Sequence, residues 1–418
     1  MEDFYIGFCE FSQGISGIHV IPSRNNQPFP SLLPYNRYET GKLHTAFIAV
    51  IVLAILSSCA KDHATPKPTN PVALPPLSSG LYVLLQGSYD TGIILPTDTA
   101  YKSSLGYYNF VAKTEIPDQF KLANGSAVGL NASDMEIYGS KMYIAVGTTG
   151  VVDIADVKTT RLLKRDSLPN PTFKAPFGQP YFSPLYVAFY QGQAIVSATI
   201  GMKSEIVVID TSTLAIVKTI PVNGFLGGLA VANHKLYVAV EAPLSDSIDV
   251  LDLASWAFIR SVKVLVNPVN VAADSFGNIY VLSGFEDFFT GATTIFSPGG
   301  IDIIDSRSDK VTFEKAETIA PDIAFSGDFA YYVTNLKNIN ILNARTQTSV
   351  STNFITNGNT ISIASAITVN SATGEIFVAD AKPYFISPGT IYAFDKNGKL
   401  EYNFTTGVSP VKLAVQNQ

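Results

Sequence analysis

The chain has 418 residues, of which 47% are hydrophobic and 15% are charged, so it can bury a large core. Its formal net charge of -6 and its pI near 5.3 argue against nucleic-acid binding, which requires a basic surface. Only Cys9 and Cys59 are present, and both precede the repeats described below. Neither the fold nor a thiol mechanism in the repeats can therefore depend on cysteine.

The first sixty residues have the pattern of a lipoprotein export signal. An apolar segment, 46–56, follows Lys42; it is too short to span a bilayer, which takes about 20 residues, but it suits the core of a signal peptide. Leu56, two serines and Cys59 come next, and this order resembles a bacterial lipobox, whose cysteine is acylated and becomes the mature N-terminus. An ordinary buried strand that precedes a cysteine is the alternative.

These features predict how the chain is organised before the repeats. Residues 1–40 are interpreted as a candidate mis-annotated N-terminal extension, 41–58 as the signal peptide, and 59–79 as an extended, proline-rich tether. Lipidation at Cys59 predicts a bacterial cell-envelope protein attached to a membrane, expected to be the outer membrane, without spanning it. The sequence leaves open whether the protein faces the periplasm or the exterior.

Residues 81–395 repeat one phrase seven times: a short apolar run, then a second apolar run that ends in Asp or Asn. The first runs are 81–85, 142–146, 194–198, 236–240, 279–283, 331–335 and 376–380. The second runs end at Asn109, Asp156, Asp210, Asp252, Asp305, Asn343 and Asp395. A spacing of 38 to 54 residues fits four short strands with their turns, which is one propeller blade. The sequence therefore predicts an all-β protein, with a seven-bladed β-propeller over 80–418.

The two ends of the repeat array predict how the ring closes. The first repeat lacks an opening strand because the tether directly precedes Leu81, whereas 408–415 reads as an opening strand with no repeat after it. We expect the C-terminal strand to pair into the first blade, which removes open sheet edges. We also expect the recurring Asp or Asn to accept backbone N–H groups of the following turn, a role in folding rather than in catalysis.

Residues for common catalytic and metal chemistry are scarce in the repeats. Of the four histidines only His234 lies there, in a turn, where a solvated side chain is favoured over a metal ligand. The sequence has no phosphate-binding loop, dinucleotide fingerprint or calcium loop, so no cofactor and no metal are predicted. The remaining catalytic alternative is a site of carboxylates alone, from Glu241, Asp246, Glu286 and Asp287.

A binding role is better supported, because long loops of one class are rich in aromatic residues. Loops that join second to third strands, and each blade to the next, open onto one face of a propeller; here 86–104, 169–184 and 283–300 are long and aromatic. Aromatic rings in such loops commonly mark a recognition surface, although the rings could instead bury one another. The predicted ligand-binding residues are Tyr89, Asp90, Tyr101, Phe173, Phe177, Tyr181, Phe285, Glu286, Asp287, Phe288, Phe289, Asn335 and Tyr384.

The segments 80–92 (GLYVLLQGSYDTG) and 132–156 (ASDMEIYGSKMYIAVGTTGVVDIAD) resemble YncE-like propeller lipoproteins of Gram-negative envelopes. Family members have Asn-Glu-Gly and Asn-Asp-Met where this chain has Leu85-Gln86-Gly87 and Ser133-Asp134-Met135. The resemblance implies a propeller over about 80–418 and is sharp over 80–156. Some relatives capture cobalamin on the loop face beside an outer-membrane transporter, which makes such a transporter an expected partner. The loops of this chain contain no motif specific for a corrinoid.

These observations leave three hypotheses for function. The main one is a non-enzymatic, lipid-anchored propeller that binds a small molecule or glycan on its loop face, with nutrient capture for uptake as its sharper form. The second is a protein–protein scaffold, which predicts a flatter apolar patch. The third is a carboxylate-dependent lyase or hydrolase at the channel mouth, which predicts acids that converge on one point with raised pKa values.

Overall fold

The structure is a computed structural model, and it describes residues 76–87, 102–169, 181–200, 203–240, 245–284, 299–357, 360–382 and 386–417. All these ranges belong to one compact unit, 73–418. The predicted N-terminal extension, the signal peptide, Cys59 and most of the tether lie outside the described residues.

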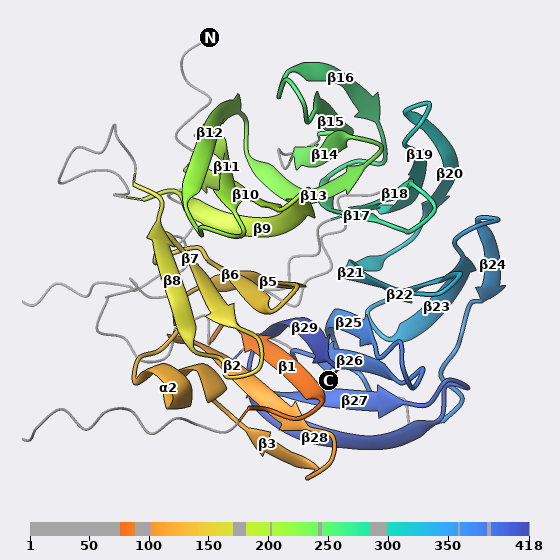
Figure 1. Cartoon of the computed structure of the whole chain (residues 1–418). Helices are drawn as coiled ribbons and strands as arrows, with labels where there is room; N and C mark the ends of the chain where they lie inside the picture. The colour runs from red at the N-terminus through yellow and green to blue at the C-terminus, as the bar shows by residue number, and fades with distance from the viewer. Residues whose placement is uncertain are drawn as a thin grey trace, which may run out of the picture. The chain divides into compact units, whose positions relative to one another are not determined.

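Seven antiparallel sheets surround a central channel, which confirms the predicted seven-bladed propeller (Figure 1). Blade one contains β29 (Pro410–Gln416), β1 (Gly80–Leu85), β2 (Lys102–Asn109) and β3 (Thr114–Ile116), and β4 (Gly129–Leu130) also pairs with β2. Blade two contains β5 (Ala132–Tyr138), β6 (Lys141–Val146), β7 (Val151–Asp156) and β8 (Leu162–Ser167). Blade three contains β9 (Ser183–Tyr190), β10 (Gln193–Ile200), β11 (Lys203–Asp210) and β12 (Ile216–Asn223).

The other four blades repeat this order from the inner to the outer strand. Blade four contains β13 (Leu226–Ala232), β14 (Lys235–Val240), β15 (Ser247–Asp252) and β16 (Phe258–Lys263). Blade five contains β17 (Pro268–Ala273), β18 (Asn278–Ser283), β19 (Gly300–Asp305) and β20 (Lys310–Ala316). Blade six contains β21 (Ile319–Ser326), β22 (Phe329–Thr334), β23 (Asn338–Asn343) and β24 (Thr348–Ser351). Blade seven contains β25 (Ala364–Val369), β26 (Ile376–Asp380), β27 (Pro388–Phe394) and β28 (Leu400–Val408).

The ring closes through the C-terminal strand, as predicted. β29 pairs antiparallel with β1 from Gly80 opposite Gln416 to Leu85 opposite Pro410, and so supplies the inner strand that blade one would otherwise lack. The next strands of the blade, β2 and β3, come from the start of the propeller. The first blade therefore joins both ends of the repeat array, and no inner edge is left open there.

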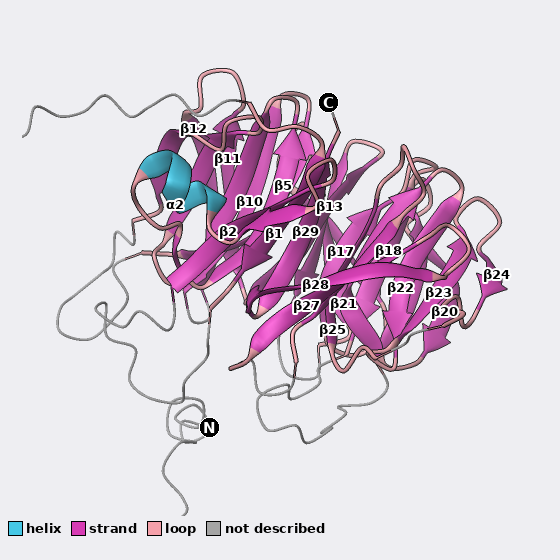
Figure 2. Ribbon diagram, turned by 90° about the horizontal axis from the view of Figure 1, so that it is seen from below, coloured by secondary structure: helices cyan, strands magenta, loops and turns pink. Residues whose placement is uncertain are grey.

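Each pair of adjacent blades encloses its own hydrophobic core. Seven clusters of buried side chains fill the seven spaces between blades, and the blades stand side by side as layers of strands in Figure 2. β1 and β18 are buried at every position because side chains on both of their faces enter such a core. Double-sided burial explains why the middle strands read as nearly continuous apolar runs.

The recurring Asp and Asn residues bind the turn that follows the third strand, which confirms their predicted role. In all seven blades the side-chain oxygen accepts a backbone N–H of that turn at 2.7 to 3.3 Å, as in Asp210 with Thr213. Hydrogen bonds from N–H and hydroxyl groups of the turns also lower the pKa of Asp210, Asp252 and Asp305. The same hydrogen bonds therefore stabilise both the charged carboxylate and the turn.

Blade one departs from the regular pattern at its outer edge. Helix α2 (Gln119–Asn124) lies there beside β2, between the short strands β3 and β4 (Figures 1 and 2). Asp118 caps its first turn by accepting the N–H of Lys121 at 3.0 Å, and Gly125 ends it in a left-handed conformation with φ of 72°. Phe120 is buried in the core between blades one and two, so the helix covers the edge that a full fourth strand covers elsewhere.

A buried carboxyl group in blade five lacks the partner that its counterpart in blade two has. Asp153 and Asp302 occupy the third position of β7 and β19, but Arg165 faces Asp153 at 2.6 Å whereas Glu314 is paired opposite Asp302. The Asp302 side chain is fully buried, accepts only the N–H of Leu265, and has no partner for Oδ1. Burial raises the pKa of Asp302 to about 6, and Glu314 adds to the rise.

We predict that Asp302→Asn stabilises the propeller at neutral pH. Because the pKa of Asp302 is raised from about 3.9 in the unfolded chain, the folded state loses stability as the pH rises from about 4 through 6. Asn does not titrate. The melting temperature of the Asp302→Asn variant should therefore exceed that of the wild type by a few degrees at pH 7.5 and by less at pH 4.5. Glu314→Arg, which copies blade two, should act in the same direction.

Thermal unfolding followed by circular dichroism at the two pH values measures this effect. Asp153→Asn is the matched control, and it should destabilise because it weakens the pair with Arg165. An equal loss of stability at both pH values for Asp302→Asn would contradict the prediction.

Candidate functional site in the central channel

Most of the predicted ligand-binding residues lie outside the described part of the chain. These are Tyr89, Asp90, Tyr101, Phe173, Phe177, Phe285, Glu286, Asp287, Phe288, Phe289 and Tyr384. The described strands do fix the face on which their loops open. Since the strands of each blade alternate in direction, second-to-third loops and blade-to-blade crossings leave the same side, which we call the loop face.

Tyr181 is one of the two predicted binding residues that the structure describes. It forms an isolated bridge with Pro169 and packs against Gly150, while 41% of its side chain stays exposed. The next ring in the same crossing, Phe182, is buried in the core between blades two and three. This crossing therefore uses one aromatic ring for the core and presents another to solvent.

Asn335 is the other predicted binding residue that the structure describes, and the backbone conformation at this position favours asparagine. It begins the turn between β22 and β23, where Asn335 and Leu336 both adopt positive φ values of 49° and 56°. Asn tolerates this region better than most residues, and the following Leu336 is buried between blades six and seven. Its backbone N–H donates to the carbonyl of Thr318 at 2.9 Å. Asn335 and Tyr181 thus belong to different blades and each has its own local contacts.

Of the residues considered for catalysis, the structure describes only His234 and Asp246. His234 lies in an exposed turn with a φ of 61°. Its Nδ1 is 2.8 Å from the hydroxyl of Tyr190. Asp246 is half exposed and pairs with Lys263 at 3.3 Å, and Glu241, Glu286 and Asp287 lie outside the described residues. Within the described ranges, no group of three His, Cys, Asp or Glu side chains is arranged to hold a metal ion.

The channel holds a cavity of about 490 Å³, lined by the inner strands of all seven blades. Small apolar side chains, among them Ala188, Ala230 and Ala273, line it from blades three to five, but polar atoms make up more than half of the surface that faces the cavity. Four charged side chains line it, and they meet in one group inside the channel. We call Asp134, Glu136, Asp322 and Lys412 the channel cluster.

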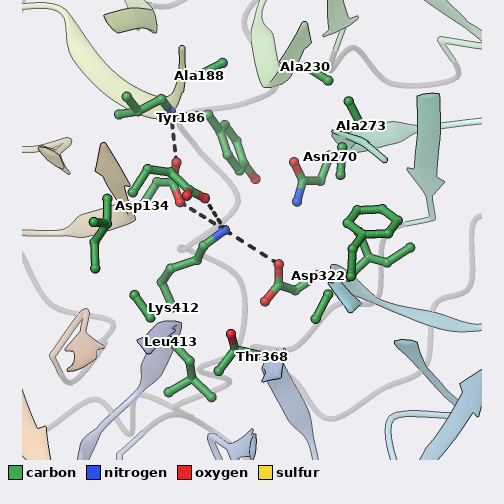
Figure 3. A pocket seen from close by; sticks show the side chains of 18 of the residues that line it. Asp134, Tyr186, Ala188, Ala230, Asn270, Ala273, Asp322, Thr368, Lys412 and Leu413 are labelled. Carbon is green, nitrogen blue, oxygen red and sulfur yellow. Dashed lines mark hydrogen bonds and ion pairs between the residues drawn. The ribbon is translucent and has the colours of Figure 1, made fainter. Parts of the chain in front are cut away.

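Lys412 is the centre of the channel cluster (Figure 3). Its Nζ lies 2.9 Å from Glu136 Oε1, 3.4 Å from Asp134 Oδ1 and 3.7 Å from Asp322 Oδ1. Asp134 and Glu136 come from blade two, Asp322 from blade six, and Lys412 from the closing strand. One side chain of β29 therefore links both sides of the channel.

A bulge near the start of each inner strand positions these side chains. The pairing of inner and second strands shifts register in all seven blades. Asp134 and Lys412 each directly follow the residue that the shift skips. Because bulges increase the local twist and re-aim side chains, they turn these residues toward the channel near its loop-face end.

Hydrogen bonds between adjacent inner strands fix two of the acids. Asp134 Oδ2 accepts the N–H of Val187 at 2.9 Å, and Asp322 Oδ2 accepts the N–H of Ile367 at 3.0 Å. The side-chain amide of Asn270 likewise donates to the carbonyl of Pro321 at 2.9 Å. Inner strands do not pair with one another, so these side chains satisfy backbone groups that would otherwise lack partners.

The channel cluster shifts the titration of its own members. Burial raises the pKa of Glu136 and of Asp322, and Lys412 opposes the rise. Burial alone would lower the pKa of Lys412, but the three carboxylates together raise it well above its usual value. Lys412 therefore stays an ammonium group at neutral pH, which suits electrostatic binding and not an amine nucleophile.

Comparisons with known proteins bear on the fold alone. No protein-family profile and no curated protein matches the sequence. A solved structure of a quinoprotein alcohol dehydrogenase-like protein from Bacteroides thetaiotaomicron is similar, with a TM-score of 0.58 and 16% identity over 80% of this chain and 78% of that one. The computationally designed protein Ika8 has a TM-score of 0.50 and 12% identity over 82% of this chain and 94% of its own.

The described residues include no helix that is long and apolar enough to cross a membrane.

We predict that Lys412→Met destabilises the propeller at neutral pH. It leaves three crowded carboxylates without their cation, a loss of about 3 kcal/mol of unfolding free energy. The loss should be smaller at pH 5, because Glu136 and Asp322 have raised pKa values and can take up protons. Urea unfolding at pH 7.5 and pH 5 measures the difference.

Lys396→Met is the control, because Lys396 lies exposed in the turn after β27. It should change the unfolding free energy by no more than about 0.5 kcal/mol. A Lys412 variant as stable as this control at pH 7.5 would show that the channel cluster contributes nothing to stability.

Proposed function

We propose that this chain is a non-enzymatic envelope protein, lipid-anchored at Cys59, that binds a small molecule at the loop-face end of its channel. One observation carries the proposal: a cavity of about 490 Å³ in which small apolar side chains lie across from one group of fixed charges. Ligand sites in proteins typically have volumes of about 300–1,000 Å³, apolar linings and a few convergent polar groups.

The channel cluster lies at the loop-face end of the channel, which favours a binding site at that end. Asp134 and Lys412 sit near the beginning of their inner strands, and the blade-to-blade crossings arrive at that end. The loops at 86–104, 169–184 and 283–300 open on the same face. A ligand at this end of the channel would lie on the face from which those loops leave, which is consistent with nutrient capture beside an outer-membrane transporter.

The convergence of acids gives the lyase or hydrolase alternative one supporting observation. Asp134, Glu136 and Asp322 approach one point, and burial raises the pKa of two of them. However, that point is occupied by the Lys412 ammonium, and two of the acids also bind backbone N–H groups. Groups engaged in this way are better suited to hold a charge in place than to transfer protons.

We expect calorimetric titration of the chain without its signal peptide and lipid to show saturable binding of at least one compound among corrinoids, glycans and small metabolites. Ala188→Trp should weaken that binding at least about tenfold, because the indole would fill the channel beside the cluster. Val217→Trp on the exposed strand β12 is the matched control and should bind as the wild type does.

Melting temperatures of both variants establish that they fold. Binding that is insensitive to Ala188→Trp would place the site outside the channel, and no binding across the panel would overturn the small-molecule proposal in favour of a protein partner.

A further inference from the structure

We infer that the channel takes a small molecule with a primary ammonium or guanidinium group on an apolar body. This inference rests on the proposed function and names the class of ligand. It follows from the charge balance of the cavity wall, from the long distances between Lys412 and two of the carboxylates, and from the small apolar side chains on the opposite side of the cavity.

The charge balance of the cavity wall favours a cation. Asp134, Glu136 and Asp322 give three formal negative charges against one positive charge on Lys412, and no other charged side chain lines the cavity within the described residues. Like charges in a confined, poorly hydrated space repel one another strongly. A second cation among these acids would relieve that repulsion, whereas an anionic ligand would add to it.

Asp134 Oδ1 and Asp322 Oδ1 lie farther from Lys412 Nζ than a good charge-assisted hydrogen bond requires. Asp134 Oδ2 accepts the N–H of Val187, and Asp322 accepts the backbone N–H groups of Ile367 and Ile323. Lys412 Nζ lies 3.4 Å from Asp134 Oδ1 and 3.7 Å from Asp322 Oδ1. These distances exceed those of good charge-assisted hydrogen bonds, about 2.7–2.9 Å. The side chains are only 3% and 9% exposed, so bulk water has little access to them. An ammonium or guanidinium group can supply several N–H donors at once.

The side of the cavity across from Lys412 carries three alanines together with the polar side chains of Asn270 and Tyr186. Figure 3 shows Ala188, Ala230 and Ala273 on the far side of the cavity from the ammonium group. The alanines leave room there for the apolar body of a ligand. The cavity therefore fits an amphipathic cation whose charged end meets the acids and whose body covers the alanines.

The titration of the acids adds an expected pH dependence. Burial raises the pKa of Glu136 and Asp322, and the charged groups that face them are Asp134 and Lys412. A cation binds better to the ionised acids, so its affinity should fall as the pH is lowered from 8 to 5. Over this range an alkylammonium group stays charged, since its pKa is near 10.

Three probes with the same body test the inference: phenethylamine, 2-phenylethanol and phenylacetate. In calorimetric titrations at pH 8, the amine should bind at least about tenfold more tightly than the neutral and anionic probes. Asp322→Asn and, separately, Asp134→Asn should each weaken amine binding roughly tenfold or more. Asp246→Asn, at an exposed aspartate outside the channel, is the matched control and should leave it unchanged.

The outcomes separate this inference from the proposed function. Equal binding of amine and alcohol, or tighter binding of phenylacetate, overturns the inference. A second outcome is that the amines do not bind, whereas another compound binds and Ala188→Trp abolishes its binding. The proposed function then holds and the inferred ligand class is wrong. Amine binding that survives both Asp variants, with each variant folded by its melting temperature, also contradicts the inference.

Discussion

The pairing of β29 with β1 is the constraint on which the rest of the structure depends. Strands from the two ends of the repeat array form one sheet, so β29 completes the first blade. The same strand carries Lys412 into the channel, where its ammonium group meets acids of blades two and six. Closure of the ring and assembly of the channel cluster are therefore one event, and neither blade two nor blade six can form the cluster alone.

Much of the fold could be predicted because the repeat has a physical cause. Each blade is packed on both faces, so its middle strands must be apolar throughout, and each hairpin after the third strand needs a side chain to bind its turn. These two demands produce the repeated runs and the Asp or Asn at their ends. Closure was also predictable, since a first repeat without an inner strand and a last strand without a blade require each other. Helix α2, capped by Asp118 and Gly125, was not predicted, because it interrupts a repeat made of strands.

The channel site could not be predicted, because its members are far apart in sequence and belong to no motif. Asp134 and Lys412 are charged residues in inner strands that otherwise face a narrow channel, and that contrast is the signal that sequence reasoning missed. Their orientation depends on bulges that shift the pairing by one residue, which an apolar pattern does not reveal. The difference between Asp153 and Asp302 was hidden for a similar reason, since it lies in the opposite residues, Arg165 and Glu314. The aromatic loops, by contrast, remain a prediction from sequence.

The central claim is that Lys412 is held as an ammonium group among three carboxylates in the channel, and lysine labelling tests it most directly. Reaction of the intact protein with an amine-reactive reagent at pH 8, followed by peptide mass spectrometry, gives a rate for each lysine. We expect Lys412 to react at least about tenfold more slowly than the exposed Lys396, because only the neutral amine reacts and the acids raise the pKa of Lys412. Glu136→Gln should speed its reaction. A Lys412 that reacts as fast as Lys396 would contradict the account.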